Sequence, residues 1–130
     1  LPDYASFHVV LSSSDFVEPP MQRQWMVARR AVVNRVIRWL VEVDSGGGTQ
    51  PIPAFHHVFA LDTRPDVIFF LTDGQIPPET AAVVRDLNKR GGRVVINTIA
   101  FGDPTSQDQL KEIARDSGGV YRFVSTEGRR

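Results

Sequence analysis

Cysteine is absent from this chain of 130 residues, and its absence removes several classes of protein at once. Disulfide scaffolds, zinc–thiolate sites, iron–sulfur clusters and cysteine nucleophiles all need the missing sulfur. An excess of charge is missing too, because 15 basic and 15 acidic side chains give a formal net charge of zero. This balance argues against a general electrostatic binder of nucleic acids or anionic membranes. No apolar run approaches the roughly 20 residues that a membrane-spanning helix needs.

What is present is the composition of an ordinary globular protein. Apolar residues make up 42% of the chain and charged residues 23%, which is too apolar, at zero net charge, for an intrinsically disordered protein. A chain of this length buries roughly two thirds of its surface and therefore has room for a core. The length predicts a single domain over residues 1–130.

Short apolar runs rich in Val, Ile and Phe predict the strands. The runs at 67–71 and 94–101 are nearly continuous, as expected for parallel strands that helices cover on both faces. The run at 120–124 alternates more and predicts an edge strand. A run at 7–11 predicts the first strand, and residues 22–27 predict a short edge strand after a proline turn.

Segments with helical spacing lie between these runs. Residues 28–43 put apolar side chains on one face and most of their arginines on others. The other predicted helices cover 50–61, 78–90 and 105–117, with proline near the start of the first two and glycine after the last two. This alternation of strands and helices predicts an α/β domain with a mostly parallel sheet and right-handed crossovers.

Polar side chains follow the predicted strands at the edge where open parallel sheets bind ligands. Ser12–Asp15 follows the first strand, Thr72–Gly74 the second and Gly102–Asp103 the third. The loop at 45–49 leads into the second helix at the same edge. Carboxylate, hydroxyl and water oxygens are the ligands that a hard divalent cation such as Mg²⁺ prefers. The residues on this rim are therefore of the type that such a cation needs.

Two parts of this rim can also be interpreted without a ligand, and the residues alone do not decide between the two interpretations. Gly46–Gly48 brings the backbone close to a ligand, or it is a flexible connector with Thr49 as the helix N-cap. A phosphate cradle at that helix start is a further option, although no Gly-Lys-Ser/Thr sequence occurs and a nucleotide P-loop is therefore absent. The pair Asp73-Gly74, taken alone, is also ordinary turn chemistry.

Taken together, the motifs are more specific. The order and spacing of GGGTQP, DVIFFLTDG, VVINTIAFGD and LKEIARDSGGVYRFV closely resemble the von Willebrand factor A family over nearly the whole chain. The resemblance implies a doubly wound, Rossmann-like sheet with a divalent metal, usually Mg²⁺, in a metal-ion-dependent adhesion site. It implies that Thr49 and Asp73 contact the metal, directly or through water, and that a carboxylate of a partner protein takes the remaining position. The loop positions that support this site are Gly47, Gly48, Thr72 and Gly74.

One part of the family pattern is missing. The Asp-x-Ser-x-Ser motif that ends the family's first strand occurs nowhere, and Ser12–Asp15 matches the end of its second strand instead. We therefore expect an incomplete copy of a longer protein, without the first strand and first helix. The missing strand would be central, so one or both of the runs at 7–11 and 67–71 should expose backbone and apolar side chains, which favours self-association, unless the sheet rearranges. With two oxygen ligands, the chain alone should bind Mg²⁺ weakly or not at all.

Other polar residues carry less information about function. His56 and His57 are adjacent and point to different helix faces, so they do not form an i, i+4 metal pair, and we assign no metal or catalytic role to any histidine. Asp15 and Asp103 lie on the rim but match no metal position of the family, which favours loop roles. The arginines of the helix at 28–43 are interpreted as a solvated face.

Three functions are compatible with the sequence, in order of preference. The first is a protein-interaction module from a larger protein, whose parent domain binds an acidic residue of a partner through Mg²⁺. The second is a structural or assembly domain that works without metal. The third, an enzyme that binds a nucleotide or phosphate at Gly46–Gly48, is disfavoured because no lysine, dinucleotide fingerprint or candidate base accompanies the loop. We expect no enzymatic activity and no nucleic-acid partner.

Overall fold

The computed structural model describes residues 6–8, 11–12, 16–20, 22, 25–42, 51–72 and 74–125. The predicted helices, and the strands predicted after residue 60, are confirmed to within two residues at each end. The helices are α1 (Arg30–Glu42), α2 (Pro51–Phe59), α3 (Thr80–Asn88) and α4 (Gln107–Ser117). The strands are β1 (Ser6–Phe7), β2 (Leu11–Ser12), β3 (Phe16–Val17), β4 (Met26–Val27), β5 (Val67–Thr72), β6 (Val95–Phe101) and β7 (Tyr121–Val124).

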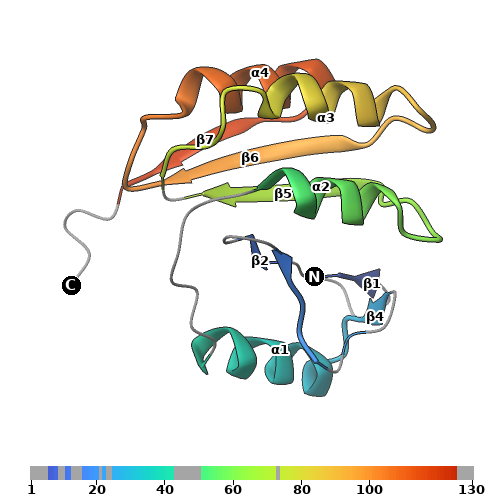
Figure 1. Ribbon diagram of the computed structural model, residues 1–130. Helices are drawn as coiled ribbons and strands as arrows, with labels where there is room; N and C mark the ends of the chain where they lie inside the picture. The colour runs from blue at the N-terminus through green and yellow to red at the C-terminus, as the bar shows by residue number, and fades with distance from the viewer. Residues whose placement is uncertain are drawn as a thin grey trace.

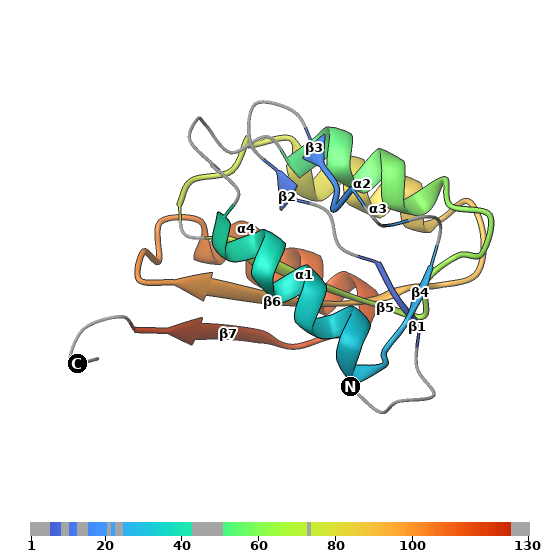
Figure 2. The same cartoon turned by 90° about the horizontal axis from the view of Figure 1, so that it is seen from below.

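The last three strands form a parallel sheet in the order β5–β6–β7, with β6 in the centre. A helix connects each strand to the next, as parallel neighbours require. In Figure 1, α3 and α4 lie on one face of this sheet, and α1 lies on the opposite side. Figure 2, seen from below, places α1 in front of the sheet and α3 and α4 behind it. The predicted α/β architecture with a parallel sheet is therefore confirmed.

The two faces of β5 are buried unequally. Phe70 and Thr72 point to the helix-covered face and are 8% and 6% exposed. On the other face, Val67, Phe69 and Leu71 are 45%, 61% and 49% exposed. The prediction that helices cover both faces of this strand is therefore wrong. The apolar exposure expected beside the missing family strand is confirmed for β5.

The run at 7–11 does not form one strand of the main sheet, which corrects that prediction. β1 pairs antiparallel with β4, and β2 pairs antiparallel with β3, in two separate two-stranded sheets. Among the described residues, no strand bonds to the free edge of β5. The short segments therefore pair with local partners to satisfy their backbone groups. β4 confirms the end of the edge strand predicted at 22–27.

The main core lies between the parallel sheet and the helices α2, α3 and α4. Phe55 of α2 meets Phe70 of β5 edge to face, with ring centroids 5.0 Å apart. Ile96 of β6 and Leu110 of α4 are both 0% exposed. Full burial of an apolar side chain of this size contributes about 1.5–3 kcal/mol to stability. The other members of this core are Phe59, Ile76, Ala81, Val84, Leu87, Val94, Ala100 and Ile113.

Two buried hydroxyls fix α4 on β6. Thr98 donates from Oγ1 to a carbonyl of α4 (2.9 Å), and Ser117 Oγ accepts a hydrogen bond from the amide of Ile96 (2.8 Å). Gly118 then ends the helix with a φ of 84°, which favours glycine. Gly119 lies so close to β6 that a Cβ would stand 2.0 Å from the carbonyl oxygen of Ile96. The helix end predicted from this glycine pair is confirmed.

α1 presents its arginines to solvent, as predicted. Arg30, Arg35 and Arg38 are exposed, while Val36 is 3% exposed and faces inward. Within the described part of the chain, each helix is too short or too polar to cross a membrane.

Candidate functional site

The rim at the carboxyl ends of the parallel strands begins with the turn after β5. The hydroxyl of Thr72 accepts a hydrogen bond from the amide of Gly74 and donates one to the carbonyl of the same residue, both at 3.3 Å. Threonine hydroxyls commonly close such local turns. The residues on both sides of Asp73 are therefore held in place.

The start of α4 braces the chain that leaves this turn. Ser106 Oγ accepts a hydrogen bond from the amide of Ile76 (3.0 Å) and donates one to the carbonyl of Gly74 (3.1 Å). Gln109 donates from Nε2 to the carbonyl of Pro77 (3.0 Å), and its Oε1 accepts a bond from an amide of α3 (2.7 Å). These bonds join the start of α4 to the segment between β5 and α3, and they fix the backbone of the rim.

The second loop of the rim follows β6. Gly102 turns the chain with a φ of 73°. Asp103 then accepts hydrogen bonds from the hydroxyl of Thr105 and from its amide, the latter at 2.9 Å. These two bonds, the hydroxyl first, lower the pKa of the Asp103 carboxyl. The predicted loop role of Asp103 is confirmed, while Asp15 lies outside the described residues.

The residues assigned to the metal site by family resemblance are only partly described. Thr72 and Gly74 lie together in the turn after β5, where the hydroxyl of Thr72 is occupied by hydrogen bonds of the turn. The contacts of the metal itself stay predictions, because both contacting residues lie outside the described part. The residues of the site outside the described part are Gly47, Gly48, Thr49 and Asp73.

The donor set that this chain brings to the rim is too small for a complete Mg²⁺ site. Mg²⁺ takes six ligands in near-octahedral geometry. The sequence carries Thr49 and Asp73 but no Asp-x-Ser-x-Ser motif. The neighbouring oxygens of Thr72 and Asp103 are used by their own loops. A full coordination shell would need water, a partner carboxylate or ligands from another segment.

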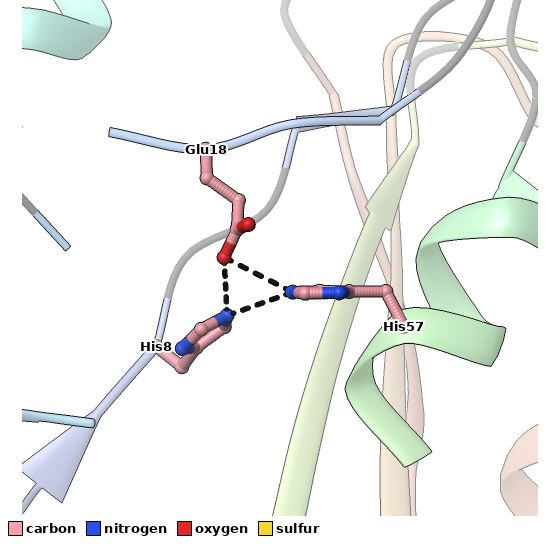
Figure 3. Close-up of side chains that lie close together, drawn as sticks. All are labelled: His8, Glu18 and His57. Carbon is pink, nitrogen blue, oxygen red and sulfur yellow. Dashed lines mark hydrogen bonds and ion pairs between the residues drawn. The ribbon is translucent and has the colours of Figure 1, made fainter. Parts of the chain in front are cut away.

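A second group of polar side chains gathers from three separate segments. His8 follows β1, Glu18 follows β3 and His57 lies in α2. Glu18 Oε2 lies 2.7 Å from His8 Nε2 and 3.0 Å from His57 Nε2, and the two Nε2 atoms are 3.3 Å apart. Figure 3 shows the three side chains converging on one point. We call this group the His–Glu cluster.

The His–Glu cluster is sheltered but open to solvent on one side. The side chain of His8 is 3% exposed, and those of Glu18 and His57 are 29% and 25% exposed. Within the described residues, no other group of three or more His, Asp or Glu side chains brings its ligand atoms close enough to share a metal ion.

Gln22 and Trp25 surround the cluster. Gln22 Nε2 donates to Glu18 Oε2 (2.8 Å) and lies 3.0 Å from His8 Nε2. The ring of His8 is in contact with Trp25 and His57, at centroid separations of 5.9 and 5.4 Å. Partial burial raises the pKa of Glu18, but hydrogen bonds from Gln22 and His57 and the charges of the two histidines lower it more, so the net shift is downward.

The sequence did not predict this cluster. His8 was placed inside a strand of the main sheet, and 49 residues separate it from His57. Neither histidine belongs to a spacing typical of metal ligands. The expectation that His56 and His57 face different directions is confirmed, since His56 is exposed and His57 is half-buried. The local signal was a histidine and a glutamate ten residues apart, each directly after a short strand, and it does not locate His57.

Comparison with known proteins gives a consistent result. Residues 1–123 match the family model of the von Willebrand factor type A domain. A solved structure of a von Willebrand factor type A protein from Catenulispora acidiphila is similar at 21% identity and a TM-score of 0.76, covering 95% of this chain and 30% of that one. Proximal thread matrix protein 1 from the mussel byssus is similar at 21% identity and a TM-score of 0.69, covering 95% and 31%.

These structural likenesses concern the fold. At this level of identity they do not transfer a binding partner, and the chain spans about a third of the length of the two solved proteins. None of the curated proteins matches the chain.

Proposed function

Because this chain belongs to the von Willebrand factor type A family, we propose that it is a protein-interaction module that binds a partner at the rim formed by the carboxyl ends of β5 and β6. The observation that carries the proposal is the braced turn after β5. Its hydrogen bonds hold Thr72 and Gly74, the two neighbours of Asp73, and so support a site at this turn, where the family resemblance implies a metal. The module acts by binding, with no catalytic step.

In this proposal Thr49 and Asp73 are the chain's own contribution to a divalent metal site. When bound, a Mg²⁺-type ion supplies a positive charge that attracts a carboxylate of the partner. In the proposal, the hydroxyl of Thr49 and the carboxylate of Asp73 orient that site. Since two oxygens do not complete the shell, we expect weak Mg²⁺ binding by this chain alone.

The enzyme alternative has less support. The loop at Gly46–Gly48 has no lysine beside it, and the sequence lacks a dinucleotide fingerprint and a P-loop. The carboxylate of Asp103, which lies on the rim, is bound by its own loop. These features favour recognition over chemistry at this edge of the sheet.

The metal part of the proposal is tested by thermal unfolding in Mg²⁺ and in chelator. A ligand that binds only the native state stabilises it by RT ln(1 + [L]/Kd), which is about 2.7 kcal/mol at a hundredfold excess over Kd. We expect a small rise of Tm in high Mg²⁺ that Asp73→Ala abolishes. Asp66→Ala is the matched control, because Asp66 is exposed at the opposite end of β5.

Two results would contradict this part of the proposal. An equal Mg²⁺ response in Asp73→Ala and in the unchanged chain would place the ion elsewhere. A response lost equally in Asp66→Ala would show a general charge effect in place of a site on the rim.

One observation favours a second function, assembly without metal. The outer face of β5 exposes Val67, Phe69 and Leu71 in a row, beside an edge without a strand partner in the described part of the chain. Exposed apolar edges of this kind pair readily with another chain. In that case the module would associate through β5, with no effect of Mg²⁺ on its affinity.

A further inference from the structure

We propose that the His–Glu cluster is a binding site for a zinc-type transition-metal ion, with His8, Glu18 and His57 as its protein ligands. The site is separate from the proposed rim site in its residues and in the kind of ion. It therefore stands or falls independently of the proposed function.

The spacing of the ligand atoms suits a tetrahedral ion. With bonds of about 2.0–2.1 Å to each ligand, tetrahedral geometry separates the ligand atoms by about 3.3 Å. The Nε2 atoms of His8 and His57 are already 3.3 Å apart. Glu18 Oε2 lies closer, at 2.7 and 3.0 Å, because it now accepts hydrogen bonds. A shift of the partly exposed Glu18 carboxylate by a few tenths of an ångström completes the triangle.

The close contacts of the cluster cannot all be hydrogen bonds at the same time. A neutral imidazole Nε2 either donates or accepts, but not both. If both histidines donate to Glu18 Oε2, the 3.3 Å contact between their Nε2 atoms is not itself a hydrogen bond. If His8 Nε2 accepts from Gln22 instead, it no longer donates to Glu18. A cation at the centre would accept lone pairs from both imidazoles and the carboxylate, and would account for all three contacts together.

The donor types select the class of metal. Two imidazole nitrogens and one carboxylate oxygen suit Zn²⁺ and its transition-metal neighbours, whereas Mg²⁺ prefers a shell of oxygens alone. Partial exposure of Glu18 and His57 leaves room for water as the fourth ligand. Gln22, which donates to Glu18, would keep the carboxylate aimed at the ion, as outer-shell partners do.

A metal in this position would join three parts of the chain that are distant in sequence. His8 and Glu18 follow short strands, each in a two-stranded sheet, whereas His57 belongs to the helix that carries Phe55 and Phe59 of the main core. Because the three ligands come together only in the folded protein, the binding free energy stabilises the fold. Zinc should therefore raise Tm and tie the N-terminal strands to α2.

The test is a Zn²⁺ titration of the full chain in competition with a chromophoric chelator. Co²⁺, which absorbs in the visible when tetrahedral, reports the coordination. We expect one Zn²⁺ per chain. We also expect His57→Ala and Glu18→Gln each to weaken binding by more than about tenfold, since loss of an outer-shell partner alone costs 10–100-fold. His56→Ala is the matched control, because its ring is exposed on the neighbouring position of the same helix.

The proposal is overturned if the unchanged chain binds no more tightly than His57→Ala, or if His56→Ala weakens binding as much as His57→Ala does. Glu18→Gln guards against a folding artefact, because it keeps the shape of the side chain and removes only its charge. Asp73→Ala should leave Zn²⁺ binding unchanged, and His57→Ala should leave the Mg²⁺ response unchanged. These two variants therefore test the zinc site of the His–Glu cluster and the magnesium site of the rim independently.

Discussion

At the scale of single residues, Asp103 and Glu18 are two carboxylates whose neighbours lower their pKa values. Asp103 is recognisable in the sequence as a rim residue, and its partner Thr105 is two positions away, so its loop role could be predicted from local chemistry. Glu18 could not be interpreted in the same way. Its partners His8 and His57 come from segments whose approach depends on tertiary packing, which no local spacing encodes.

Asp103 gives the prediction that belongs to this scale. Its pKa is lowered in the folded protein, so the charged carboxylate adds stability above the ordinary pKa of about 3.9. That contribution is lost as the pH falls through the lower, folded-state pKa. Asp103→Asn should therefore be less stable than the unchanged chain at neutral pH, and the difference should vanish in acid. Urea unfolding from neutral to acidic pH measures this.

Thr105→Val is the companion variant for that experiment, since it removes the hydroxyl donor but keeps the amide donor. In a chain that already carries Thr105→Val, Asp103→Asn should still lower the stability at neutral pH, but by less than it does in the unchanged chain. A destabilisation by Asp103→Asn that stays constant down to acidic pH would rule out the charged hydrogen bond as its cause.

At the scale of elements, the junction between α4 and β7 shows what local sequence can and cannot predict. The bounds of α4 were predictable because its apolar periodicity and the glycines after its last turn are local signals. Gly118, with its φ of 84°, is such a signal. The contact of Gly119 with β6 is not a local signal, because its partner Ile96 is distant in sequence. The short strands β1 and β2 were mispredicted for the same reason, since a strand is defined by its partner.

Gly119→Ala is the prediction at this scale. The new Cβ would lie 2.0 Å from the carbonyl oxygen of Ile96 and 2.6 Å from its carbonyl carbon, and neither backbone atom can move without opening the sheet. We expect the free energy of unfolding to fall by about 3 kcal/mol or more, which is at the upper end of the range for overpacked sites. Urea unfolding measures it. Gly92→Ala, where a Cβ meets nothing within 4 Å, should change stability by less than about 1 kcal/mol. Equal effects of both variants would contradict the steric argument.

At the scale of the whole molecule, α3 and α4 cover one face of the parallel sheet, and α1 lies on the other side without burying the outer side chains of β5. Within the described residues, β5 also has a free edge. The family resemblance made this exposure predictable, because a central strand of the family pattern has no counterpart in the sequence. What the sequence could not predict is how the N-terminal segments respond. They pair with one another in two small antiparallel sheets and leave the outer face of β5 open.

Self-association through β5 is the prediction at this scale. Phe69 is 61% exposed at the centre of the outer row, so Phe69→Lys should fold normally and shift the chain toward the monomer. Sedimentation velocity over a range of concentrations measures the effect. Ile37→Lys on α1, where Ile37 is 51% exposed, is the control for a general gain in solubility. A monomeric unchanged chain, or equal effects of both variants, would rule out association through this strand.

The uneven placement of the main core has a consequence for how unfolding is observed. All its members lie between Phe55 and Ile113, whereas both tryptophans, Trp25 and Trp39, precede that region. Segments with few buried apolar contacts open at a lower free energy than the global transition. We therefore expect tryptophan emission to follow the opening of the N-terminal third, while far-ultraviolet circular dichroism reports the helices of both parts. The two optical signals should therefore separate during urea unfolding, with tryptophan emission changing first.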